Sequence, residues 1–234
     1  MKILIEIGFV ILSYLLGSIP SALIISKIFF KIDIREHGSN NMGATNALRV
    51  MGMKYATIVF IMDALKAGTL VFLFTYNILS RDLIPHIPPV FLGLVSIIGH
   101  IFPIYVKFKG GKGVASATGV ILACHPVCFI VEIIIFLLVV ILTKYVSVGS
   151  IISIIIVFFL SFFIPPLFED APNIYFSIFT GIMMGIIIID HLPNIKRLIH
   201  GTESKTTKSL FTRKKRQVTN NEETINKEND IKNK

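Results

Sequence analysis

Residues 114–143 read VASATGVILACHPVCFIVEIIIFLLVVILT, and this stretch decides how the chain must fold. A helix needs about 20 apolar residues to cross a bilayer, so the run is too long for one comfortable crossing. Proline disfavours helix continuation, and the pair His125–Pro126 interrupts the run. We therefore expect two membrane segments here, a short one at Val114–Ala123 and a fuller one at Val127–Thr143.

The composition of the whole chain is that of a membrane protein. Of its 234 residues, 53% are hydrophobic and 16% are charged, and the mean hydropathy is +0.76. A soluble domain usually has about 25% charged residues. Further apolar runs suited to membrane helices are Ile3–Ser26, Tyr55–Leu79, Pro88–Val106, Val148–Ile164 and Asn173–Ile189. We predict an all-α, polytopic integral membrane protein with about seven transmembrane segments, one of them short.

The basic residues lie on alternate connections between these segments. Residues 27–54, residues 107–113 and the C-terminal stretch are rich in Lys and Arg, whereas residues 165–172 contain neither. With seven segments all the basic connections fall on one side, which the positive-inside rule makes the cytoplasm. The N-terminus is then outside and the C-terminus cytoplasmic. A six-segment model fits worse, because it separates the first basic connection from the C-terminal one.

The net charge of +9 fits such cytoplasmic loops, close to anionic lipid, and does not require nucleic acid as a partner. We expect a membrane domain at residues 1–205. Residues 206–234 form a polar, basic tail with few apolar residues, and we expect it to be disordered.

The first basic connection contains His37–Arg49, which reads HGSNNMGATNALR. Backbone N–H groups and hydroxyls in such a loop can surround an anion, and arginine binds phosphate through two parallel hydrogen bonds. From composition alone, a polar turn between two helices is an equal alternative. The candidate phosphate-binding residues are Ser39, Asn41, Gly43, Thr45, Asn46 and Arg49.

The second basic connection reads FKGGKGVA from Phe108 to Ala115. Glycines and lysines run directly into the start of a helix, where backbone amides favour anions. It is not a Walker A loop, because the first glycine of that pattern is missing and Gly113 stands where Ser or Thr should be. We favour phosphate binding over a plain basic turn. The candidate residues are Lys109, Gly110, Gly111, Lys112 and Gly113.

The third stretch, Asp190–Lys205, reads DHLPNIKRLIHGTESK and follows the last membrane segment. His191 is a candidate general base. If the stretch is helical, His191 and Asn194 share a face, and so do Asn194 and Arg197. A basic helix end at the membrane surface is the simpler alternative.

Several polar or small residues lie inside the apolar segments. Asp63 and Lys66 have the spacing of an internal ion pair, and His100 is an ionisable residue in an apolar run. For these residues, site support and a purely structural role are equal readings. The glycines of the GIMMG run at residues 181–185 suit a close helix approach. We interpret Cys124 and Cys128 as apolar fillers and expect no metal site.

Taken together, these motifs resemble the PlsY family, the integral-membrane acyl-phosphate:glycerol-3-phosphate acyltransferases of bacteria. The resemblance covers residues 1–205. The matching elements, in chain order, are Gly17-Ser18-Ile19-Pro20, Gly43-Ala44-Thr45-Asn46 with Arg49, Asp63 with Lys66, the block Gly99–Ala115, Tyr145-Val146-Ser147 with Ser150, and His191–Lys205.

Two positions depart from the family pattern. Asn40 stands where the family has a glycine; if that position needs a positive φ, asparagine is the least costly replacement, so we expect binding to be retained. Lys144 stands where the family has an arginine, which keeps the charge but loses the forked hydrogen-bonding group.

The resemblance implies a seven-helix fold in the bacterial plasma (inner) membrane. It also implies acyl transfer from acyl phosphate to the 1-hydroxyl of glycerol 3-phosphate, without a metal or cofactor, by a protein that we expect to be a monomer in contact with membrane lipid. The implied catalytic residues are Ser39, Arg49, Lys112, His191 and Asn194. Ser147 and Arg197 join the phosphate-binding set, and Asp63, Lys66, His100 and Glu203 support it. The rival interpretation is a transporter of an organic phosphate, which half-helices and a basic cavity would also suit.

Overall fold

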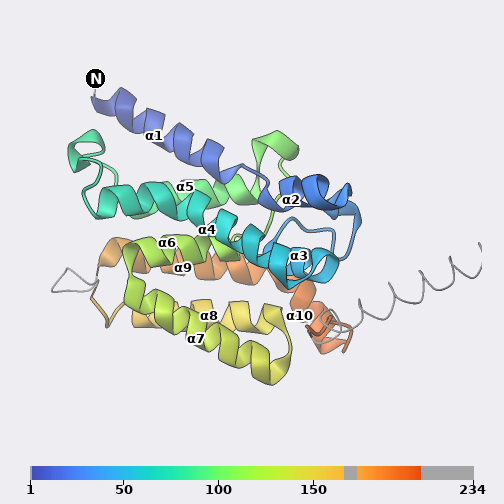
Figure 1. Ribbon diagram of the computed structural model, residues 1–234. Helices are drawn as coiled ribbons and strands as arrows, with labels where there is room; N and C mark the ends of the chain where they lie inside the picture. The colour runs from blue at the N-terminus through green and yellow to red at the C-terminus, as the bar shows by residue number, and fades with distance from the viewer. Residues whose placement is uncertain (1, 166–172, 207–234) are drawn as a thin grey trace, which may run out of the picture.

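Helices make up the regular structure of the computed structural model, which describes residues 2–165 and 173–206 (Figure 1). The helices are α1 (Lys2–Gly17), α2 (Ser21–Phe30), α3 (Ala44–Met51), α4 (Met53–Thr75), α5 (Pro89–Ile101), α6 (Val114–Cys124), α7 (Pro126–Thr143), α8 (Val146–Leu160), α9 (Ile174–Asp190) and α10 (Leu192–Ile199). Three 3₁₀ turns, η1 (Ile34–Glu36), η2 (Arg81–Leu83) and η3 (Ile104–Val106), lie between them. Since the described residues contain no strand, the predicted all-α class is confirmed.

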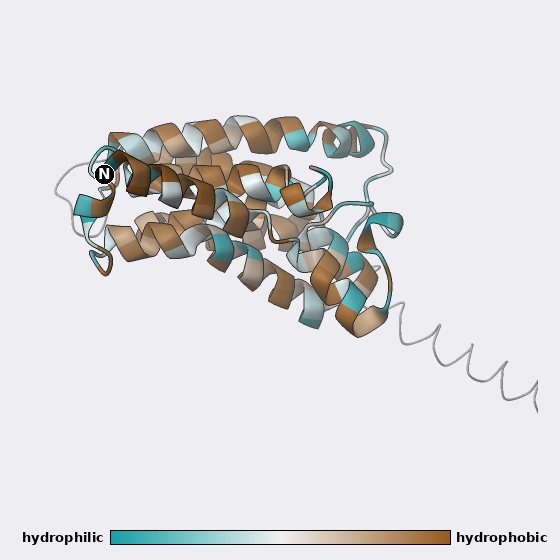
Figure 2. Ribbon diagram, turned by 90° about the horizontal axis from the view of Figure 1, so that it is seen from above, coloured by the Kyte–Doolittle hydropathy of each residue, from teal (hydrophilic) through white to brown (hydrophobic). Residues whose placement is uncertain are grey.

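The long helices lie side by side, and the short ones gather at one end. In Figure 1, α2, α3 and α10 lie together at the end of the bundle where α4 begins and α9 ends. Figure 2 shows apolar residues along the long helices and hydrophilic residues mainly toward their ends. The three basic connections predicted from the sequence therefore collect at one end of an apolar bundle.

The lengths of the helices separate clear membrane spans from shorter segments. Four helical stretches are long and apolar enough to cross a membrane: Lys2–Phe30, Met53–Thr75, Pro89–Val106 and Pro126–Thr143. Helices α9 and α10 qualify together as a pair bent by 51°, and α6 and α8 are apolar but shorter. Each predicted membrane segment thus contains a helix, and α6 is the short one that was expected.

The predicted break at His125–Pro126 is confirmed, and the His125 imidazole caps the start of α7 and binds the segment that follows α8. Nδ1 of His125 accepts a hydrogen bond from the backbone N–H of Cys128 at 3.2 Å, which caps the start of α7. Nε2 donates to the carbonyl of Ile164 at 3.0 Å. Cys128 is fully buried in the apolar core.

The predicted membrane segment Ile3–Ser26 lies within the candidate span Lys2–Phe30, but this span is broken, because α1 ends at Gly17 and α2 begins only after Pro20. Proline lacks the N–H that a continuous helix would use at that point. The first basic connection is not only a loop, since it contains α3.

Close backbone contact between α4 and α6 determines how tightly the centre of the bundle packs. A Cβ atom at Gly119 of α6 would overlap the backbone of Ala64, and one at Gly68 of α4 would overlap the backbone of Gly119. In the 181–185 run, a Cβ atom at Gly181 would lie 3.0 Å from the Phe158 ring and one at Gly185 would meet nothing within 4 Å, so the expected close approach does not extend to Gly185. Glycine is needed where α4 packs on α6 and also where α1 packs on α5, since Cβ atoms at Gly17 and Gly99 would overlap the backbone of Ser96 and Tyr14.

We expect Gly119→Ala to lower thermal stability, because its methyl group meets backbone that cannot move aside. Overpacking of this kind costs about 1–3 kcal/mol. Gly185→Ala is the matched control; it should be neutral or slightly stabilising, because alanine favours helix by about 1 kcal/mol. Thermal unfolding followed by labelling of buried Cys128 with a thiol-reactive fluorophore measures both. Equal midpoints for the two variants would contradict the close approach of α4 and α6.

Candidate active site

The carboxylate of Glu203 lies at the centre of the polar cluster at this end of the bundle, with its side chain 2% exposed. Oε1 accepts hydrogen bonds from Nδ2 of Asn194 at 2.7 Å and from Oγ of Ser147 at 3.3 Å. Oε2 accepts from Nε of Arg197 at 2.6 Å. The guanidinium of Arg49 lies 3.5 Å from Oε1. One carboxylate therefore gathers side chains from α3, α8 and α10.

Lys112 joins this cluster from the second basic connection. Its Nζ donates a hydrogen bond to Oδ1 of Asn194, so the Asn194 amide bridges Lys112 and Glu203. Burial, followed by the positive charge of Arg197, lowers the pKa of Lys112 to about 8. Burial of Glu203 works to raise its pKa, but hydrogen bonds from Asn194 and Arg197 outweigh it and hold the pKa below its usual value. The carboxylate is therefore ionised at neutral pH.

A short segment after α10, Gly201–Thr206, carries Glu203 into the cluster. Gly201 has a φ of 67°, in the left-handed region that favours glycine, and turns the chain away from α10. Thr206 donates from its N–H and its hydroxyl to the carbonyl of Lys144 at 2.9 and 3.0 Å. Nζ of Lys205 lies 5.7 Å from the centre of the Tyr145 ring. The segment is thus fastened to the turn between α7 and α8.

Lys144 takes part in this arrangement through its backbone. It ends α7 with a φ of 67°, and its carbonyl receives both hydrogen bonds from Thr206. Its side chain is exposed. The Lys144 side chain therefore takes no part in the described hydrogen bonds and ion pairs of the Glu203 cluster.

The first basic connection is shaped by the side chain of Asn46, which is 1% exposed. Its Nδ2 donates to the carbonyls of Ile34, His37 and Asn41, and its Oδ1 accepts from the N–H of Ser39 at 2.8 Å. This amide is used within the loop itself. Asn40 has a φ of 57°, so the positive φ considered for that position is present.

The other predicted residues of this connection occupy two places. Thr45 and Arg49 line a pocket with Val146 and the segment Ser204–Thr206, next to the Glu203 cluster. Ser39 is exposed, and Asn41 and Gly43 are half-buried in the loop. Lys109 is likewise exposed at the surface of the second connection.

His191 lies at the bend between α9 and α10, 5% exposed. The prediction that it shares a helix face with Asn194 was wrong, because α9 ends at Asp190 and a new helix begins at Leu192. Nδ1 donates to the carbonyl of Ile187 at 2.8 Å, since a carbonyl only accepts, which leaves Nε2 as an acceptor. Burial and the charge of Lys112 lower the pKa of His191 to about 4. Its imidazole is neutral at pH 7.

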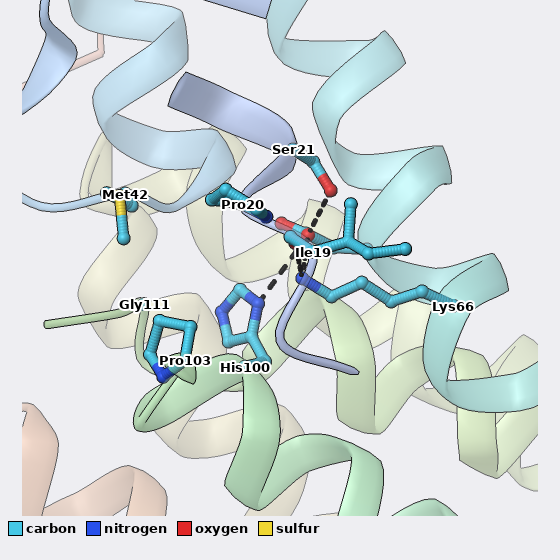
Figure 3. Close-up of a pocket in the computed structure, with 9 residues that line it drawn as sticks. Ile19, Pro20, Ser21, Met42, Lys66, His100, Pro103 and Gly111 are labelled. Carbon is cyan, nitrogen blue, oxygen red and sulfur yellow. Dashed lines mark hydrogen bonds and ion pairs between the residues drawn. The ribbon is translucent and has the colours of Figure 1, made fainter. Parts of the chain in front are cut away.

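A second polar cluster surrounds His100 and Lys66 (Figure 3). The predicted Asp63–Lys66 ion pair is confirmed, with Nζ 2.7 Å from Oδ1. Nδ1 of His100 lies 3.5 Å from the same oxygen. Ser21, which was not predicted, donates its hydroxyl to Oδ1 at 2.8 Å. No spacing signal links residues 21 and 63, because only the packing of α2 on α4 brings them together.

The fold and this site define a polytopic membrane protein with a cluster of cationic side chains at one end of its helices. The family model for glycerol-3-phosphate acyltransferases matches residues 7–201. Glycerol-3-phosphate acyltransferase 2 of Bacillus anthracis is 47% identical over 83% of this chain and 96% of its own length. Glycerol-3-phosphate acyltransferase of Bacillus subtilis strain 168 is 42% identical over 84% of this chain and 95% of its own.

Solved structures agree with these relatives. The crystal structure of PlsY, an integral membrane glycerol 3-phosphate acyltransferase, in its glycerol 3-phosphate form superposes with a TM-score of 0.73. It is 35% identical and covers 86% of this chain and 94% of that one. The chain belongs to the glycerol-3-phosphate acyltransferase family that includes PlsY. It is an integral-membrane acyltransferase of lipid biosynthesis.

Asn46→Asp should disrupt the first basic connection, because a carboxylate cannot donate to the three carbonyls that the amide serves. Each buried acceptor left without a partner costs about 1–3 kcal/mol. Asn40→Asp is the matched control: it adds the same charge in the same loop, on an exposed residue whose conformation aspartate tolerates. We expect lower thermal stability and lower acyltransferase activity for Asn46→Asp alone. Equal losses in both variants would show that charge, and not hydrogen bonding, is responsible.

Proposed function

We propose that the protein transfers an acyl group from acyl phosphate to the 1-hydroxyl of glycerol 3-phosphate. The products are 1-acyl-glycerol 3-phosphate (lysophosphatidate) and phosphate. The observation that carries the proposal is the cluster of cations around Glu203 at one end of an apolar bundle. A polar phosphate from water and an acyl chain dissolved in lipid would meet at such a place. The family relationship and the relatives' printed names support the choice of acceptor.

The charges of the cluster suit a phosphate group. Three cations, Lys112, Arg49 and Arg197, face a single buried carboxylate. The excess of positive charge matches a phosphate monoester, which carries about −1.5 to −2 at pH 7. Guanidinium groups add the paired hydrogen bonds that phosphate oxygens accept. In this proposal Ser39, Thr45 and Lys109 complete the phosphate contacts from the two loops.

The reaction needs no enzyme nucleophile, because acyl phosphate is already activated. The acceptor hydroxyl attacks the acyl carbonyl, an ester C–O bond forms, and the bond between the acyl carbon and the phosphate oxygen breaks. Lys112 and Asn194 stabilise the negative charge on the carbonyl oxygen in the transition state. The phosphate leaves with the bonding electrons, and the hydroxyl proton ends on it as hydrogen phosphate.

His191 orients the hydroxyl in this scheme. Its Nε2 is free to accept a hydrogen bond, and its imidazole is neutral. With a pKa of about 4, His191 is a weaker base than a phosphate group, whose second pKa is about 6. The leaving phosphate is therefore the better final acceptor of the proton.

The placement of the motifs supports an orientation in the membrane. The first, second and third basic connections collect at one end of the bundle (Figure 1). We propose that this end faces the cytoplasm of a bacterium, with the N-terminus outside and the enzyme a monomer in the plasma (inner) membrane. The predicted disordered tail begins at residue 206. Thr206 is held by its hydrogen bonds to Lys144, and residues 207–234 lie outside the described residues.

The first test is phosphate release by the detergent-purified protein with an acyl phosphate donor, with and without glycerol 3-phosphate. We expect acceptor-dependent release with matching lysophosphatidate. Lys112→Ala should lower kcat/KM by about 10²-fold or more. Lys27→Ala, an exposed lysine on α2, is the control and should leave activity unchanged. Folded wild-type protein that never turns over acyl phosphate would overturn the proposal and call for transport measurements in vesicles.

The pH profile gives a second test of Lys112. Its ammonium is charged below its pKa of about 8 and neutral above it. Phosphate binding needs the charge, so kcat/KM for glycerol 3-phosphate should fall as pH rises through about 8. Lys112→Arg keeps its charge, because the guanidinium pKa exceeds about 12, and should remove this decline even if its maximal activity is lower. If kcat/KM of Lys112→Arg falls with rising pH as it does in the wild type, the decline is caused by the titration of another group.

A further inference from the structure

We propose that Asp63 and His100 are positioning residues for the phosphate-binding loop. The Asp63 carboxylate fixes the His100 imidazole, and the imidazole fixes the path of Gly110–Gly111, which places Lys112. This inference rests on the proposed function, since it concerns the same loop. It assigns a role to the second polar cluster. Among the described residues, no hydrogen bond or ion pair joins that cluster to the side chains around Glu203.

Asp63 is held by elements on several sides. Its side chain is 1% exposed, and Oδ1 receives the hydroxyl of Ser21 from α2 and the ammonium of Lys66 from α4. Nζ of Lys66 also donates to the carbonyl of Ile19, in the break between α1 and α2, at 2.8 Å. The carboxylate oxygen that faces His100 is therefore fixed in place by α2, by α4 and by the break before α2.

His100 presents its ring to two partners. Nδ1 faces Asp63, so the opposite edge, with Nε2, is directed at the loop. A Cβ atom at Gly111 would overlap Nε2, Cε1 and Cδ2 of the imidazole. Figure 3 shows the ring between Lys66 on one side and Gly111 and Pro103 on the other. The loop can lie where it does only because residue 111 has no side chain.

The backbone of His100 fixes the same loop. Its carbonyl accepts a hydrogen bond from the N–H of Gly111 at 3.1 Å, and a Cβ atom at Gly110 would overlap this carbonyl and that of Ile101. The next residue is Lys112, whose ammonium reaches Asn194 in the Glu203 cluster. Contacts therefore run without a gap from Asp63, through His100 and Gly111, to Lys112.

Stability alone is a weak reason for such a cluster. A buried ion pair is often no more stabilising than apolar residues of the same volume. Among the described residues, Oδ2 of Asp63 has no hydrogen-bond partner, which makes the cluster still more costly. Ionisable residues within membrane segments usually serve a site. Here the cluster provides a rigid support on which the loop rests.

A double-mutant cycle tests the contact between ring and loop. We expect Gly111→Ala and His100→Ala each to raise the KM for glycerol 3-phosphate about tenfold or more, because each displaces Lys112. In the double variant the missing ring leaves room for the new methyl group. The fold-increase in KM of the double variant should therefore be about tenfold or more smaller than the product of the fold-increases of the two single variants. Gly111 has no positive φ, so the contact alone penalises the alanine.

Gly110→Ala is the matched control. Its methyl group meets backbone carbonyls, and removal of the His100 ring cannot relieve that overlap. In the Gly110→Ala, His100→Ala double variant, the fold-increase in KM should therefore equal the product of the two single fold-increases. If the Gly111→Ala, His100→Ala double variant also gives that product, the imidazole does not determine the position of the loop, and the proposal fails.

Asp63→Asn separates positioning from stability. The amide keeps the shape of the carboxylate but loses its charge, so the ring should be held less firmly. We expect a KM raised about tenfold with a much smaller change in kcat. A purely structural role would lower the thermal midpoint and the amount of active enzyme but leave the KM of the folded fraction unchanged, and that result would overturn the proposal.

A binding measurement distinguishes this proposal from the proposed function. Inorganic phosphate should protect wild-type protein against thermal unfolding, and Gly111→Ala should need about tenfold more phosphate for the same protection. The Gly111→Ala, His100→Ala double variant should recover part of that loss. Wild-type protein without any phosphate protection would count against the proposed function itself. Protection that is equal in all three proteins would count against the positioning role alone.

Discussion

The ionised carboxylate of Glu203 is the interaction on which the site depends. This group is the shared partner, in the part of the chain that the structure describes, of four side chains from three different helices: Arg49, Ser147, Asn194 and Arg197. Cations gathered at one place repel one another, and a buried carboxylate offsets that repulsion while leaving an excess of positive charge. In the proposed function, a substrate phosphate would meet side chains that are already in place, so that little reorganisation would be needed.

The packing of the helix bundle is the second constraint, because it fixes the Asp63–His100 cluster relative to the Glu203 cluster. Helix α6 packs backbone to backbone on α4 at Gly119, and the same α4 carries Asp63 and Lys66. Lys112 stands just before α6 and reaches into the Glu203 cluster. The contacts between α4 and α6 therefore hold the supporting cluster and the loop in one rigid unit. A protein interior packed this closely transmits small displacements.

Much of the fold was readable from the sequence because a membrane imposes simple rules. Apolar runs of the right length gave the helices, and His125–Pro126 gave the break before α7. The break at Ser18–Pro20 was missed, since residues 3–26 are apolar on both sides of it. Helix α3 was missed because a run rich in Gly and Asn resembles a loop. Its formation depends on packing against α4 and on the Asn46 amide, both of which are tertiary contacts.

The sequence by itself determined the helical membrane class, the three basic connections and the family, because these depend on composition and on local order. It also named Glu203 and the Asp63–Lys66 pair, which the structure places in two buried polar clusters. Only the tertiary structure decided which of them touch. It made Glu203 the centre of the cluster, turned Asn46 inward to its own loop, and set His100 between Asp63 and Gly111. Such contacts join residues far apart in the chain, and their geometry is fixed by how whole helices pack, which no local pattern records.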